Sequence, residues 1–131
     1  MTIEKIISWL KAEGAQEIQT PQNLSIIFEL KYKELMIGFL KLHDEVWTYE
    51  YSEDFKLQHD IQPLTDFPDM NKVYKSKDLL PYFLQRIPSL SQPKVKEVIK
   101  KEKIDTSSDV ELLKRFGRKS ITNPFKLQPA F

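Results

Sequence analysis

The sequence predicts an α+β fold, in which a small antiparallel β-sheet packs with about four short helices in a single domain. Strand-forming residues alternate between Leu24 and Tyr51, whereas helical spacing and capping signals dominate after residue 78. The chain has 131 residues, of which 40% are hydrophobic and 30% are charged. A chain of this length and composition can form one core that buries roughly two thirds of the surface exposed in the unfolded state. A second domain has little room.

The first expected element is a helix from Thr2 to Glu13 that ends at Gly14, a residue type common just past helix ends. After a polar stretch, the run Leu24 to Leu30 is rich in strand formers and leads through Tyr32-Lys33 into Leu35. Together with the next two strands it predicts a three-strand meander that finishes at Tyr51.

The segment from Leu35 to Phe55 predicts a tight hairpin followed by a short helical turn. We expect Leu42 to pair with Glu45 across a His43-Asp44 turn. Facing residues of an antiparallel pair share one side of the sheet. That register sets Leu40 opposite Trp47, Gly38 opposite Tyr49 and Met36 opposite Tyr51, all on one face. Gly38 then leaves room for the Tyr49 ring, and the other face, which includes Ile37, is mixed.

The remaining chain predicts mostly helices. One helical turn is expected at Glu53–Leu57, with Phe55 pointing inward, and residues 60–75 are expected to be extended or looped because prolines punctuate them. The next elements, in order, are a helix from an Asp78 cap to Arg86, a basic amphipathic helix starting at Ser91-Gln92-Pro93, a helix with the capping box Ser108-x-x-Glu111 that stops at Gly117, and a final strand through Phe125 and Leu127.

Charge is distributed unevenly along the chain. Residues 1–69 have a balance of −7 and residues 70–131 a balance of +8, although the net charge is only +1. The basic half either attracts nucleic acid or an acidic protein surface, or it is neutralised by the acidic half. The four cations between Lys114 and Lys119 also have two interpretations. They contact phosphates or an acidic partner, or they form a solvated helix end.

Most catalytic classes lack their residues in this sequence. No cysteine is present, and three glycines are too few to build a phosphate-cradling loop. We expect His43 and His59 to be surface residues, adjacent acids such as Glu53-Asp54 to be solvated, and the Trp47, Tyr49 and Tyr51 rings to form core rather than a base-stacking platform. The predicted protein is a non-enzyme without cofactor or metal. We expect no signal peptide and no membrane span, hence a cytoplasmic location.

Several short motifs, taken in order, resemble the N-terminal domain of HipA-type serine/threonine kinase toxins of bacteria. They are Gly38-Phe39-Leu40, the aromatic strand Trp47 to Tyr51, Phe55, Leu79-Leu80-Pro81-Tyr82-Phe83, and the stretch from Leu112 to Ser120. The resemblance covers about residues 24–127, which leaves 1–23 as an additional helix and connection and 128–131 as a tail. Tyr32-Lys33 departs from the Asn-Gly usual at the first hairpin, and Ile87-Pro88-Ser89 departs from a Leu-Pro-Glu-Gly-like step.

The resemblance implies a stand-alone domain similar to the small HipS-like subunit of split systems. In full-length relatives the kinase core follows this domain, whereas this sequence ends before it, so we expect no kinase activity. The implied partners are a HipA-like kinase, which the domain would dock on and restrain, and a HipB-like DNA-binding antitoxin. The expected partner-binding residues are Tyr82, Arg86, Lys114, Arg115, Arg118, Lys119 and Phe125. The alternative is a nucleic-acid-binding accessory protein that uses Lys100, Lys101, Lys103 and the same four cations from Lys114 to Lys119.

Overall fold

A computed structural model describes residues 26–130 and confirms the α+β prediction. Its five strands form one antiparallel sheet, and four helices lie within the described residues. The strands are β1 (Ile26–Tyr32), β2 (Leu35–His43), β3 (Val46–Tyr51), β4 (Tyr74–Ser76) and β5 (Lys126–Pro129), and the helices are α2 (Glu53–Leu57), α3 (Pro81–Leu84), α4 (Pro93–Glu102) and α5 (Asp109–Phe116). The helix expected at Thr2–Glu13 and its stop at Gly14 lie outside the described residues.

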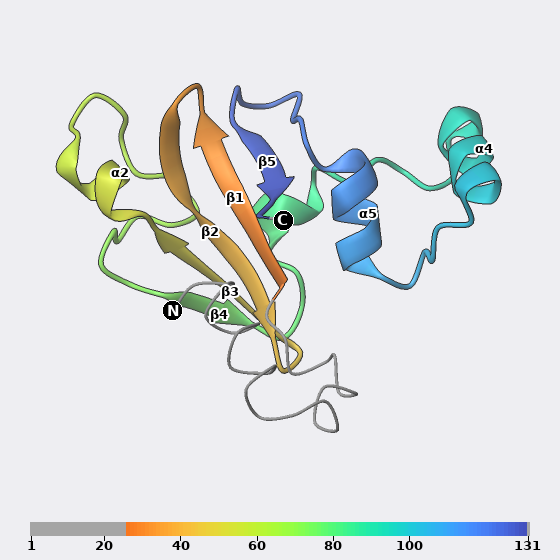
Figure 1. Ribbon diagram of the computed structural model, residues 1–131, viewed down its shortest axis with the longest axis horizontal. Helices are drawn as coiled ribbons and strands as arrows, with labels where there is room; N and C mark the ends of the chain where they lie inside the picture. The colour runs from red at the N-terminus through yellow and green to blue at the C-terminus, as the bar shows by residue number, and fades with distance from the viewer. Residues whose placement is uncertain (1–25, 131) are drawn as a thin grey trace, which may run out of the picture.

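The sheet has the order β4-β3-β2-β1-β5, so the predicted meander forms its centre. β5 returns from the far end of the chain to lie beside β1, and α3 lies behind these strands in Figure 1. α4 stands apart from the sheet at the far side of α5 (Figure 1). No helix among residues 26–130 is long and apolar enough to cross a membrane.

The predicted turn of the β2–β3 hairpin was wrong by one residue along the chain, so each residue of β2 faces a partner two positions further along β3 than expected. His43 pairs with Val46 across an Asp44-Glu45 turn, so Leu42 faces Trp47, Leu40 faces Tyr49 and Gly38 faces Tyr51. Both turn residues have positive φ, 50° and 63°, as a two-residue turn matching strand twist requires. The observed turn leaves the β-branched Val46 in the strand and puts two acidic residues in the exposed turn. A shift of this size preserves the faces, so the expected aromatic face is correct.

Gly38 has the steric role expected of it. A Cβ at this position would overlap the Tyr49 hydroxyl and the carbonyl oxygen of Glu50. Tyr49 is fully buried and lies diagonally across from Gly38 rather than opposite it. The glycine is therefore required by the close approach of Tyr49 and of the β3 backbone.

Ile37 is the one residue of β2 that departs from simple alternation. Leu30 pairs with Gly38, but Lys31 pairs with Met36, which leaves Ile37 as the extra residue of a bulge. Its side chain is fully buried although it was expected on the mixed face. The Ser52 N–H donates to the Ile37 carbonyl at 2.9 Å, and the Ser52 hydroxyl caps α2 by accepting from the Phe55 N–H at 3.0 Å. The bulge thus fixes the start of α2.

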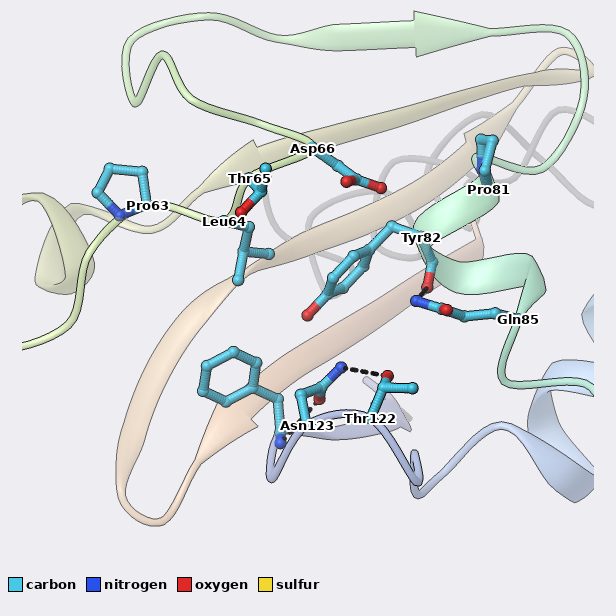
Figure 2. A pocket seen from close by; sticks show the side chains of 10 residues that line it. Pro63, Leu64, Thr65, Asp66, Pro81, Tyr82, Gln85, Thr122 and Asn123 are labelled. Atoms are coloured by element: carbon cyan, nitrogen blue, oxygen red, sulfur yellow. Dashed lines mark hydrogen bonds between the residues drawn. The ribbon is translucent and has the colours of Figure 1, made fainter.

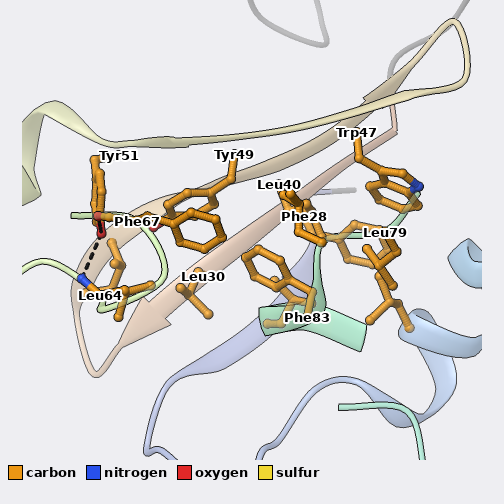
Figure 3. Close-up of a cluster of buried hydrophobic side chains, with 14 of the residues drawn as sticks. Phe28, Leu30, Leu40, Trp47, Tyr49, Tyr51, Leu64, Phe67, Leu79 and Phe83 are labelled. Carbon is orange, nitrogen blue, oxygen red and sulfur yellow. Dashed lines mark hydrogen bonds between the residues drawn. The ribbon is translucent and has the colours of Figure 1, made fainter. Parts of the chain in front are cut away.

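The hydrophobic core lies on the aromatic face of the sheet (Figure 3). Trp47, Tyr49 and Tyr51 are 4%, 0% and 3% exposed, which confirms them as core residues. Phe55 stacks on Tyr51 with ring centroids 4.8 Å apart, as expected for the inward side chain of α2. These three strand aromatics offer no free ring faces for stacking bases.

Two boundaries differ from those predicted. α3 begins at Pro81 after a Leu80 N-cap, rather than at an Asp78 cap, and it ends at Leu84, before Arg86. Leu79 and Leu80 are buried in extended chain, and proline suits the first helical position, so the helix starts later. β4 lies at the end of the stretch expected to be extended or looped, and its three residues form a strand through their pairing with β3.

The helices after α3 follow their capping signals. α4 begins at Pro93, and α5 ends against Gly117, as predicted. The Ser108 hydroxyl accepts from the Glu111 N–H at 3.2 Å. The reciprocal half of the capping box is absent, because the Glu111 carboxylate instead accepts from the Asp105 N–H at 3.2 Å. The final strand forms as β5, which pairs Leu127 with Leu30.

Candidate functional site

Two of the expected binding residues, Tyr82 and Phe125, line one groove of about 500 Å³, which we call the Tyr82 groove. Three segments form it: the loop before β4, helix α3, and the chain leading into β5 (Figure 2). The lining residues are Pro63, Leu64, Thr65, Asp66, Pro81, Tyr82, Gln85, Thr122, Asn123 and Phe125. The groove has mixed polarity, and Asp66 is the only charged residue of its lining within residues 26–130.

The loop wall of the groove is held by Tyr51 from β3. The Tyr51 hydroxyl donates to the Phe67 carbonyl at 2.6 Å and accepts from the Leu64 N–H at 2.8 Å. Burial raises the pKa of Tyr51 to about 12, although the bond from Leu64 opposes part of the rise. A core tyrosine therefore fixes the backbone on both sides of Thr65 and Asp66, and these two side chains are exposed at the groove.

Tyr82 projects from α3 into the groove between Leu64 and Asn123 (Figure 2). Its ring packs edge-on against Phe83 and Phe67, with centroids 5.1 and 5.7 Å away. Burial raises the pKa of the Tyr82 hydroxyl, and the charge of Arg86 opposes this rise. Neither the Tyr82 hydroxyl nor Arg86 Nε completes a hydrogen bond of ordinary geometry within the described chain.

Arg86 was expected at the binding surface, but only 4% of it is exposed. Its guanidinium donates to the carbonyls of Gly117 (3.1 Å), Arg118 (3.3 Å) and Phe125 (3.0 Å) and to Asn123 Oδ1 (3.2 Å). Burial lowers its pKa, and Tyr82 partly offsets this effect. Arg86 is thus an internal clamp on the segment between α5 and β5, because a cation with five donors can bind several carbonyls at once.

Asn123 is a groove residue that the sequence reasoning missed. Its side-chain oxygen accepts from the Phe125 N–H at 3.0 Å as well as from Arg86. This turn directs the Phe125 ring against Tyr32, where the centroids are 5.7 Å apart at 78°. An Asn followed by Pro124 is a turn signal, and that signal was available in the sequence.

The other expected binding residues, Lys114, Arg115, Arg118 and Lys119, are exposed at the end of α5 and just after it. Arg115 is engaged with α4, since its Nε donates to Glu102 at 2.9 Å, and this bond lowers the pKa of Glu102. Arg118 is connected to the groove through its carbonyl, which Arg86 binds together with that of Phe125. None of these four cations is among the residues that line the Tyr82 groove.

Both histidines are exposed, as expected. Within residues 26–130, no three His, Cys, Asp or Glu side chains come together to hold a metal ion. No protein-family model matches this chain, and no curated protein matches it in sequence. The Tyr82 groove and its basic flank are thus described from their own geometry.

Proposed function

We propose that this chain is a cytoplasmic, non-enzymatic, protein-binding component of a bacterial HipA-type toxin–antitoxin module. It docks on a partner kinase that lacks such a domain and restrains it. The proposal rests on the motif order that resembles the HipA N-terminal domain. The observation that carries it is the meeting of Tyr82 and Phe125, 43 positions apart, in one groove next to exposed cations.

The composition of the Tyr82 groove supports a protein partner. Aromatic residues are enriched at the energetic centres of protein interfaces, where one end of the ring is buried and the polar tip can find a partner. Tyr82 is a half-buried aromatic residue of this kind, since its ring packs on Phe83 and also lines the groove.

The charges around the groove support recognition of an acidic partner surface. Lys114, Arg118 and Lys119 are exposed, and charges at an interface rim accelerate and orient association more than they add affinity. Arg86 contributes indirectly, since it holds the backbone from which both Arg118 and Phe125 project. In this proposal the Tyr82 groove provides the main binding contacts, and the exposed cations orient the approaching partner.

Co-purification with a HipA-type kinase lacking its N-terminal domain tests this function. We expect a stable complex and reduced autophosphorylation of the kinase. Thr65→Trp places a bulky ring in the groove and should weaken the complex, whereas Asp60→Trp, at an exposed position of the same loop outside the groove, should not. A complex that leaves autophosphorylation unchanged refutes restraint but keeps docking, and equal effects of the two variants refute the groove as the docking site.

The nucleic-acid alternative is favoured by the exposure of its cations. The exposed cations are Lys100 and Lys101 of α4, Lys103 at its C-cap, and Lys114, Arg115, Arg118 and Lys119 around the end of α5. Duplex binding that falls steeply with salt and is lost in a Lys114→Glu, Lys119→Glu double variant would favour this function. No binding at low salt would remove it.

A further inference from the structure

A second hollow of about 500 Å³ lies where the β1–β2 turn meets β5, and we call it the Lys126 pocket. Among the described residues, its charged lining consists of Lys31, Lys33, Arg118 and Lys126 against Glu34 alone. The four cations come from three separate parts of the chain: β1 with its turn, the segment after α5, and β5. Folding thus gathers positive charge around one hollow, even though Lys31 and Lys33 belong to the acidic half of the sequence.

Two of these cations face each other directly across the sheet. Lys31 of β1 pairs with Lys126 of β5, so both side chains are on the same side of the sheet. Like charges directly opposite each other destabilise a strand pair. None of the four cations forms a salt bridge with another residue of the described chain. Glu34 is one acidic residue against four cations in the described lining, so the repulsion is only partly offset, and a bound anion would reduce it further.

The backbone around the pocket is held in place before any ligand binds. The Arg118 carbonyl accepts from the Leu127 N–H at 2.9 Å and from Arg86 at 3.3 Å, which fixes the position from which the Arg118 side chain projects. Lys33 occupies the β1–β2 turn with its ammonium over the Tyr32 ring, 5.3 Å from the centroid. An anion entering the pocket would meet cations whose backbone is already anchored.

We propose that the Lys126 pocket binds a compact phosphoanion, such as the diphosphate or phosphate-ester group of a small molecule. A guanidinium binds two phosphate oxygens at once, and ammonium groups add point charges, so one Arg with three Lys suits a group carrying two or more negative charges. Tyr32 and Pro124 supply an apolar wall for an organic moiety. A nucleic-acid backbone is less well matched, since it needs cations spread along successive phosphates, and these converge. The site does not depend on kinase docking.

The test is calorimetric titration of the full chain with sodium pyrophosphate at low salt. We expect saturable binding that Lys126→Gln weakens about tenfold, because one charge-assisted contact is lost. The control is Lys96→Gln, an exposed lysine of α4 outside the pocket, which should leave the affinity unchanged. Lys31→Gln, on the opposite strand, should repeat the effect of Lys126→Gln.

Thermal unfolding separates loss of the site from loss of the fold. Without pyrophosphate, Lys126→Gln should melt no lower than the parent chain, because it removes one member of a repulsive pair; with pyrophosphate it should lose the stabilisation that the parent gains. Absence of saturable binding to the parent chain, or equal weakening by Lys96→Gln, overturns the proposal. So does tighter binding of a duplex of about 12 base pairs than of pyrophosphate.

Discussion

The sheet and helix α4 are built on different principles. β1, β2 and β3 supply many of the fully buried side chains, among them Phe28, Leu40 and Tyr49, whereas α4 buries only Val95 among its ten residues and carries four lysines. α4 also stands apart from the sheet (Figure 1). Close packing in the core therefore limits which residues the sheet can contain, whereas the residues of α4 are mainly those that suit contact with solvent. Stability should respond to changes in the sheet core, and variants on α4 should leave the fold intact.

The largest effect is expected at Phe83, which packs beneath the sheet with ring centroids 5.5 Å from Tyr49 and 6.0 Å from Phe67. Phe83→Ala should lower the free energy of unfolding by about 4 kcal/mol, because it leaves a cavity in the core. The neighbouring Leu84 is 48% exposed in the same helix, so Leu84→Ala is the matched control and should cost under about 1 kcal/mol. Equal losses in urea unfolding would contradict the assignment of the core face.

The next effect is expected at Gly38. Gly38→Ala should cost about 3 kcal/mol, because its Cβ meets both the Tyr49 hydroxyl and the Glu50 carbonyl. Adding Tyr49→Phe should recover only part of the loss, since the backbone carbonyl remains in place. A chain that unfolds at an unchanged urea concentration with Gly38→Ala would show that β2 and β3 are further apart than described.

Alkaline pH tests the same core without a cavity. Tyr51 has a pKa of about 12 in the folded state against 10.0 in the unfolded state, so its contribution is complete below pH 10 and is lost as pH rises toward 12. We expect the free energy of unfolding to fall by roughly 2 kcal/mol over that range. Burial also raises the pKa of Tyr49 and Tyr82, which adds to the fall. Tyr51→Phe should flatten the pH dependence, and an unchanged profile in that variant would contradict the role of Tyr51.

A smaller effect is expected at the cap of α5. Ser108→Ala should cost about 1 kcal/mol, because the Glu111 N–H loses its acceptor. Thr106→Ala, in the exposed loop just before the cap, should change the midpoint of urea unfolding little. Equal effects of the two variants would indicate that α5 does not depend on this cap.

The smallest effect is expected on α4 itself. Lys101→Gln removes an exposed charge and should change the free energy of unfolding by less than about 0.5 kcal/mol. Val95→Ala, at the one buried position of the helix, should cost more. A loss above about 1 kcal/mol for Lys101→Gln in thermal or urea unfolding would break the distinction between the sheet and α4.

The sequence predicted faces and caps better than registers and edges. Alternation identified the aromatic face of β3, because side chains on a strand alternate regardless of register. The hairpin register depended on Asp44 and Glu45 adopting positive φ, for which neither residue is a strong signal. β4 exists through pairing with Trp47 and Tyr49, a long-range contact that no local pattern of its own residues encodes.

The Tyr82 groove was foreseen in part. Tyr82 and Phe125 were expected at a binding surface, but Arg86 was expected beside them and instead lies beneath, since its charge is satisfied by carbonyls brought from more than thirty positions away. Leu64 and Asp66 were missed because long-range contacts bring their loop to the groove, namely the hydrogen bonds of Tyr51 and the stacking of Phe67 on Tyr49. Both errors concern contacts between distant parts of the chain.

Hydrogen–deuterium exchange of the full chain, with and without the HipA-type kinase, tests the docking claim most directly. We expect added protection in the three segments that form the Tyr82 groove, around Leu64–Asp66, Tyr82–Gln85 and Thr122–Phe125, and unchanged exchange in α4. Protection confined to α4, with the groove segments exchanging as in the free chain, would contradict the account.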